Sequence, residues 1–185
     1  GVSGKTKADM VNCYSQFFKW LNKREGIPIP DMPVVEYELG WREIITIEDQ
    51  QKIIAEIKEI CPNERIYIGI KWLATYTAMR PGELWSLKEN QIDVDGYFVL
   101  SPSDTKEGKI KLVPMLDEDI ELYQSLPRGL PDMPFFRRHK GRGVKDPGGQ
   151  ISNKAFYRWW KKACDHLGVK NIDLYGGTRH STVSA

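Results

Sequence analysis

Residues 64–87 have the sequence ERIYIGIKWLATYTAMRPGELWSL, and this stretch decides the fold. Its first sixteen residues, 64–79, are apolar on nearly every side of a helix, which predicts a helix buried at the centre of a domain. Arg80 and Pro81 then interrupt the pattern, and a proline suits the first position of a new helix. We therefore expect a central helix that is followed at once by a second helix start at Arg80.

The segments before this stretch predict a division of the chain. Residues 8–23 carry apolar side chains at helical spacing. The prolines within EGIPIPDMPVV break any helix and predict a linker. Thr46 is then expected to cap a new amphipathic helix. We predict three parts: residues 1–26 as the last helix of an upstream domain, 27–40 as a linker, and 41–185 as the main domain.

The segments after it alternate between strand and helix signals. QIDVDGYFVL (91–100) and KIKLVPM (109–115) predict short strands, with a turn at Asp95-Gly96 and the connection SDTKEGK between the second pair. These segments suggest a sheet of about three strands. Helices are expected over 117–126 and after Ser152, and a last one from Thr178. The expected fold class is α+β, predominantly α-helical with a small antiparallel sheet.

The charge of the chain is unevenly distributed. The net charge is only +2, yet residues 128–170 hold eleven Lys and Arg against three Asp and Glu. This asymmetry favours either a face for a polyanion or a solvated basic surface, and charge alone does not choose between them. No apolar run is long enough to span a membrane, so we expect an intracellular protein with no membrane partner. Cys13, Cys61 and Cys164 lack metal-ligand spacing, so we expect reduced, buried thiols and no structural zinc.

Three features suggest chemistry at a phosphate. Arg80 stands at a helix start with Glu83 three residues on, Lys106 lies at a hairpin tip, and Arg179 follows the expected N-cap Thr178. Helix N-termini carry unpaired N–H groups, and an arginine fork matches two phosphate oxygens. Taken singly, each feature has a structural alternative: a surface ion pair, an exposed lysine or a capped helix. Together and in this order, they favour phosphoryl transfer.

The combination resembles the tyrosine recombinases, the phage-integrase family. AMRPGELWSL resembles the box of the first catalytic arginine, which would be Arg80 with Glu83 in support. DTKEGKIKLVPM resembles the hairpin of the catalytic lysine, Lys106. YGGTRHSTVSA resembles the box of the second arginine, Arg179, followed by His180. The resemblance runs from about residue 41 to 185, and the preceding residues resemble the end of a core-binding domain.

Two departures from the family pattern stand out. The histidine usually found three residues before the second arginine is replaced by Gly176, so either another residue takes over its role or that role is dispensable here. Tyr175 beside it is a candidate substitute, although an aromatic side chain packed under the loop is the favoured interpretation. The nucleophilic tyrosine of the family lies beyond the second arginine, and no tyrosine of this chain matches its motif. We therefore assign no nucleophile here and expect a catalytic domain that is incomplete at its C-terminal side and inactive alone.

The resemblance implies a site-specific recombinase that breaks and rejoins double-stranded DNA through a 3′-phosphotyrosyl link, without a metal or other cofactor. It also implies a cytoplasmic, nucleoid-associated protein of a prokaryote or phage, tetrameric on paired DNA sites when full length, although this chain alone could be a monomer. A non-catalytic DNA-binding relative with a regulatory role is the alternative, and an unrelated helical interaction domain is a weaker one. The side chains expected to bind DNA are Arg137, Arg138, Lys140, Arg142, Lys145, Arg158, Lys161 and Lys162.

Overall fold

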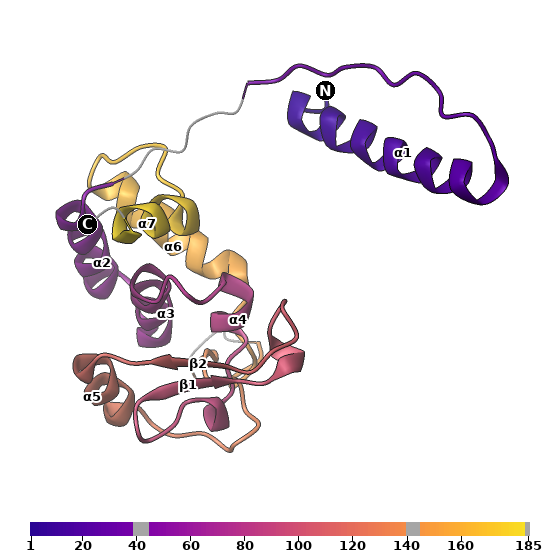
Figure 1. The fold of residues 1–185 in the computed structure, drawn as a ribbon. Coiled ribbons are helices and arrows are strands. Elements are labelled where there is room, and N and C mark those ends of the chain that lie inside the picture. The colour runs from indigo at the N-terminus through magenta and orange to yellow at the C-terminus, as the bar shows by residue number, and fades with distance from the viewer. Residues whose placement is uncertain (39–44, 140–144, 184–185) are drawn as a thin grey trace. The chain divides into compact units, whose positions relative to one another are not determined.

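The computed structural model describes residues 1–38, 45–139 and 145–183, the last four of these as backbone only. The chain divides into two compact units, Gly1–Trp41 and Arg42–Ala185. The larger unit holds the helices α2 (Ile47–Ile60), α3 (Glu64–Thr75), α4 (Pro81–Trp85), α5 (Asp117–Ser125), α6 (Asn153–His166) and α7 (Leu174–Val183), the 3₁₀ turns η1 (Glu89–Gln91) and η2 (Pro102–Asp104), and the strands β1 (Tyr97–Leu100) and β2 (Lys111–Pro114) (Figure 1). None of the described helices is both long and apolar enough to cross a bilayer.

The smaller unit is one helix with an extended segment returning along it. Helix α1 (Gly4–Glu25) begins where the Ser3 hydroxyl accepts a hydrogen bond from the Thr6 N–H. It ends at Gly26, whose φ of 69° is a left-handed conformation that glycine adopts without strain. A side chain at Gly4 would meet the Cβ of Tyr37 at 2.9 Å, so the end of the extended segment lies against the start of the helix.

Helix α3 forms the centre of the larger unit, as its all-round apolar sequence predicts. Ile68, Ile70 and Trp72 are fully buried, and α3 contacts α2, α4, α6 and α7. Gly69 permits the close approach of α6, because a Cβ there would lie 2.4 Å from the Phe156 ring. The Gly69 carbonyl also accepts a hydrogen bond from the Trp85 indole, which stacks on Phe156 at 4.4 Å. This packing anchors α4 to the core directly after Arg80.

Strands β1 and β2 pair antiparallel, with Phe98 opposite Val113. The expected third strand is reduced to a single bridge between Ile92 and Phe98, because the residues before it form the 3₁₀ turn η1. Helix α5 follows β2 and lies at the end of the sheet opposite to the turn that joins the strands (Figure 1). The expected class, an α+β fold rich in helix with a small antiparallel sheet, is confirmed.

Helix α3 ends earlier than its apolar pattern predicts. It stops at Thr75 rather than Met79, because the backbone of the C-cap residue Tyr76 leaves the helical conformation, with φ −93° and ψ 75°. The Tyr76 hydroxyl donates to the buried carboxylate of Asp119, 2.5 Å away. Burial and this carboxylate raise the pKa of Tyr76, so its hydroxyl stays protonated and donates. Lys71 donates to the other oxygen of Asp119, also at 2.5 Å. Helix α3 and helix α5 are thereby joined by polar contacts inside the core.

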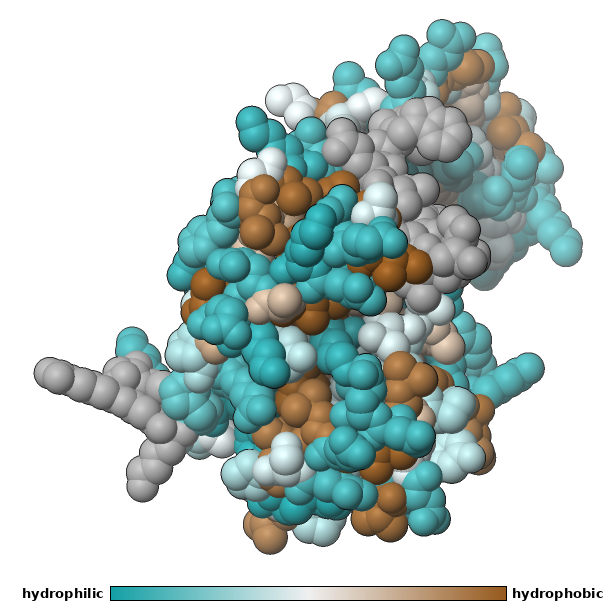
Figure 2. All heavy atoms as spheres, turned by 90° about the vertical axis from the view of Figure 1, so that its left-hand side faces the viewer, coloured by the Kyte–Doolittle hydropathy of each residue, from teal (hydrophilic) through white to brown (hydrophobic). Residues whose placement is uncertain are grey.

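The thiols and the surface differ in part from expectation. All three cysteines are free, but Cys13 is exposed rather than buried because α1 buries no residue within its own unit. Cys61 and Cys164 are buried as expected, and burial raises the pKa of the Cys164 thiol to about 11. Figure 2 shows the face on which α2 and α5 lie: hydrophilic side chains cover most of it, and hydrophobic ones form separate patches.

Candidate active site

Arg80 is oriented by a carboxylate from its own helix. It is the N-cap of α4, and the Glu83 side chain accepts hydrogen bonds from its backbone N–H and its Nη1, both at 3.1 Å. Glu83 is buried, whereas the Arg80 side chain remains 41% exposed. The capping interaction that starts the helix therefore also fixes the direction of the guanidinium group.

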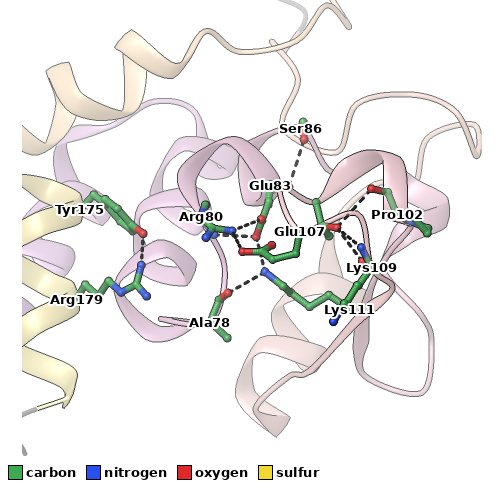
Figure 3. Close-up of polar contacts among 11 residues, drawn as sticks. Ala78, Arg80, Glu83, Ser86, Pro102, Glu107, Lys109, Lys111, Tyr175 and Arg179 are labelled. Atoms are coloured by element: carbon green, nitrogen blue, oxygen red, sulfur yellow. Dashed lines mark hydrogen bonds and ion pairs between the residues drawn. The ribbon is translucent and has the colours of Figure 1, made fainter. Parts of the chain in front are cut away.

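Lys111 holds Glu83 from the opposite side. Its Nζ, at the start of β2, lies 2.7 Å from Glu83 Oε2 and 3.2 Å from the Ala78 carbonyl (Figure 3). Burial alone would raise the pKa of Glu83, but hydrogen bonds from Lys111 and Arg80 outweigh it and lower the pKa below its ordinary value. Glu83 thus stays ionised between two cations. The alternation along β2 could have indicated Lys111, because it shares the inward-facing parity of the buried Val113.

A second carboxylate reaches Arg80 from the turn between the strands. Glu107 Oε1 lies 2.5 Å from Arg80 Nη1 (Figure 3). The hydrogen bond with Arg80 lowers the pKa of Glu107, and Glu107, followed by Glu83, raises the pKa of Arg80. The turn is closed by Thr105, whose hydroxyl donates to the Lys109 carbonyl at 2.7 Å and accepts from the Lys109 N–H at 3.1 Å. No sequence motif singled out Glu107, because its role depends on this tertiary contact.

Lys106 lies in the same turn but outside this network. Its side chain is exposed, and its amine makes no hydrogen bond or ion pair with the residues that the structure describes. The lysine that the structure brings to Arg80 and Glu83 is Lys111 instead. Lys106 directly precedes Glu107, the residue of this turn that contacts Arg80.

Helix α7 begins four residues earlier than predicted. The expected start at Thr178 is wrong, because Asp173 Oδ2 accepts the Gly176 N–H at 2.6 Å and starts the helix at Leu174. Thr178 is buried inside the helix and donates its hydroxyl to the Leu174 carbonyl. Gly176 and Gly177 lie within α7, where they are buried on a helix that contacts α3. The signal that was missed is Asp173, an N-cap residue type directly before Leu174.

Arg179 is consequently in the second turn of α7, not the first. The helix-end contribution to anion binding expected for it does not apply, since that effect is confined to the first turn. Arg179 is exposed, its Nη1 donates to the Tyr175 hydroxyl one turn earlier, and its guanidinium carbon lies 5.5 Å from the centre of that ring. Figure 3 shows Arg179 bonded to Tyr175, while the guanidinium of Arg80 turns towards Glu83 and Glu107. The His180 side chain lies outside the described residues.

The basic side chains expected to bind DNA fall into two groups. Arg158, Lys161 and Lys162 are exposed on α6, and Lys162 Nζ lies 4.7 Å above the Trp159 ring. Arg138 and Lys145 are also exposed, and Arg138 pairs with an aspartate, Asp146, at 3.5 Å. Lys140 and Arg142 lie outside the described residues.

A groove joins these two groups. It has a volume of about 490 Å³, and its lining includes Arg138, Lys145, Arg158 and Trp159. Three basic side chains and an aromatic ring therefore share one depression in the surface.

Arg137 differs from its neighbours because it is turned inward. Its side chain is only 12% exposed, and its guanidinium donates to the buried carboxylate of Glu89 and to the Pro127 carbonyl. Arg65 and Arg128 approach the same carboxylate at 3.7 and 3.8 Å. This cluster links the loop after α5 to the turn η1. The guanidinium group of Arg137 is therefore used for hydrogen bonds within the protein. Within the ranges described, no group of three or more His, Cys, Asp or Glu could hold a metal ion.

Comparisons with known proteins support the fold. No model of a known protein family matches the chain, and no curated protein sequence matches it. Among solved structures, the integrase from mycobacterium phage Brujita matches with a TM-score of 0.51 at 17% identity. The match covers 100% of this chain and 59% of that integrase, so the chain spans less than two thirds of its length. At this identity the likeness establishes an integrase-like fold and leaves the chemistry to be argued from the site.

Proposed function

We propose that this chain carries the phosphate-binding residues of a DNA strand transferase of the tyrosine-recombinase type. The observation that carries the proposal is Arg80: a partly exposed guanidinium fixed by a buried carboxylate at a helix start, within an integrase-like fold. Such a preorganised guanidinium is suited to bind the non-bridging oxygens of a phosphodiester and to stabilise the charge that develops there.

In the proposed reaction, the Arg80 and Arg179 guanidinium groups hold the scissile phosphate. A tyrosine oxygen, assigned to none of residues 1–185, attacks phosphorus as the bond to the 5′ oxygen breaks, which leaves the protein joined to the 3′ phosphate. Lys106 gives a proton to the departing 5′ oxygen. Attack by the 5′ hydroxyl of another strand reverses the step. The same number of phosphoester bonds forms as breaks, so the step needs no external energy source.

The DNA duplex is proposed to lie along the basic side chains of α6 and of the groove beside it. Arg158, Lys161 and Lys162 would contact phosphates, whereas Arg137 is left out because the fold already uses it. Phosphate contacts of this kind supply affinity and make it salt-dependent. Assembly into a tetramer on paired DNA sites is proposed for the full-length protein.

Trapping of a covalent protein–DNA adduct tests the proposal. The full-length protein is incubated with a nicked duplex, and the adduct is quantified after denaturation. Arg179→Ala should reduce the adduct by about two to three orders of magnitude, the usual effect of removing a group that stabilises developing charge, while most DNA binding persists. If DNA binding were lost and the adduct formed per bound complex were unchanged, the catalytic assignment of Arg179 would be wrong.

A DNA-binding protein of the same fold without strand cleavage is the second candidate. Gly176 favours this non-catalytic candidate, because a glycine places no side chain at the position where the family has its proton-handling histidine. The adduct experiment separates the two candidates: binding with no adduct from the unmodified full-length protein would support the non-catalytic one.

A further inference from the structure

The contact between Glu107 and Arg80 lies at the surface of the protein. The side chains are 45% and 41% exposed, so the pair is open to solvent and to a ligand. Glu107 belongs to an exposed turn, whereas Glu83, the other carboxylate on Arg80, is buried and anchored by Lys111. Arg80 therefore has one buried partner inside the protein and one exposed partner on a surface turn.

Both carboxylates use the same nitrogen of Arg80. Nη1 carries two N–H groups, and it lies 3.1 Å from Glu83 Oε1 and 2.5 Å from Glu107 Oε1. A carboxylate and a phosphate present equivalent oxygens to a guanidinium group. A phosphate can use this nitrogen only after Glu107 has left it, because the contact with Glu83 belongs to the helix cap.

The turn couples Glu107 to Lys106. The Thr105 hydroxyl spans from residue 105 to the backbone of Lys109, and Gly108 closes the turn with a φ of 64°. These contacts close residues 105–109 into one short turn that contains both Lys106 and Glu107. With Glu107 on Arg80, the neighbouring Lys106 points into solvent.

We propose that Glu107 is an internal competitor for the phosphate site at Arg80. In the free protein it occupies Nη1 of the guanidinium group, and a DNA phosphate displaces it, which releases the turn that carries Lys106. This inference rests on the proposed function, because it assumes that a DNA phosphate binds at Arg80. It assigns Glu107 as a residue that limits occupancy of the site until DNA is bound.

Equilibrium binding of a short fluorescent DNA duplex to the 185-residue chain at low salt tests the inference. Four proteins form a cycle: the unmodified chain, Glu107→Gln, Arg80→Ala and the double variant. Glu121→Gln on α5 is the matched control, because Glu121 is an exposed glutamate at the opposite end of the sheet and its substitution changes the net charge equally. Glu107→Gln should tighten binding roughly two- to fivefold beyond this control, the range expected when an exposed ion pair is released. In the Arg80→Ala background it should tighten binding no more than the control does.

Two results would overturn the inference while leaving the proposed function intact. In the first, Glu107→Gln matches Glu121→Gln although Arg80→Ala weakens binding. In the second, Glu107→Gln tightens binding equally with and without Arg80. Binding that does not depend on Arg80 in either background would remove the premise of the inference and overturn it as well. Failure of the proposed function would appear differently, as DNA binding by the unmodified full-length protein without a covalent adduct.

Discussion

Arg80 is the N-cap of α4, whereas Arg179 lies in the second turn of α7, and the two side chains are held by different numbers of elements. The carboxylates on Arg80 come from α4 and from the turn between the strands, and Lys111 of β2 supports one of them. The observed partner of Arg179 is Tyr175 on its own helix. Arg80 is therefore preorganised by tertiary structure, whereas Arg179 is oriented by a local contact that a ligand can replace.

The largest effect on stability is expected at Glu83. Glu83→Ala leaves Lys111 and the Arg80 backbone N–H without their buried acceptor, which should lower the free energy of unfolding by about 2–4 kcal/mol. Urea unfolding of the chain measures this loss in the free energy of unfolding. Glu121→Ala, an exposed glutamate on α5, serves as the control and should change stability by less than about 0.5 kcal/mol. Equal losses in the two variants would show that Glu83 does not anchor the site.

Lys111→Met tests the ion pair between Lys111 and Glu83 through the pH dependence of the free energy of unfolding. The pKa of Glu83 in the folded protein is below its ordinary value of 4.5, so the stability from its ion pairs is fully present above pH 4.5 and is lost as the pH falls through the folded pKa. The variant should be about 1–2 kcal/mol less stable at pH 7, and the difference should shrink on acidification. A difference that stays constant between neutral and acidic pH would mean that Lys111 contributes by packing alone.

A substitution at the start of α7 should lower the free energy of unfolding by less than Glu83→Ala does. Asp173→Ala removes the acceptor of the Gly176 N–H and should cost about 1 kcal/mol, the usual loss for an N-cap. Amide hydrogen exchange checks the location of the effect: protection at Gly176 should fall, while protection within α3 persists. Asp173→Asn retains an acceptor and should preserve most of the protection. Unchanged exchange at Gly176 in Asp173→Ala would refute the observed helix start.

The smallest effect is expected at Tyr175. Tyr175→Phe removes only the hydroxyl that accepts from the exposed Arg179, so the free energy of unfolding should change by no more than about 0.5 kcal/mol. Urea unfolding checks this value. A loss as large as that of Glu83→Ala would show that Arg179 is held as firmly as Arg80 and would remove the contrast between the two regions.

Local signals predicted the fold better than they predicted the site. Thr46, Pro81 and Ser152 each mark an observed helix start, because capping depends on residues next to each other in the chain. The start of α7 was missed because Thr178 was expected to be the N-cap, whereas the observed cap is Asp173, and Gly176 and Gly177 are buried within the helix.

The contacts around Arg80 could be predicted only in part. Its partnership with Glu83 is local, three residues apart, and followed from the sequence. Glu107 and Lys111 are brought to the site by the pairing of β1 with β2, so their roles depend on tertiary structure that no short motif encodes.

The central claim is that Arg80 and Arg179 neutralise charge on one DNA phosphate. The most direct test uses the full-length protein and a nicked duplex in which the scissile phosphate is replaced by an uncharged methylphosphonate. On normal DNA, Arg80→Ala and Arg179→Ala should each reduce the covalent adduct by about a hundredfold or more. On the methylphosphonate duplex, where there is no negative charge to neutralise, both losses should be much smaller. Losses of equal size on the two substrates would contradict the account.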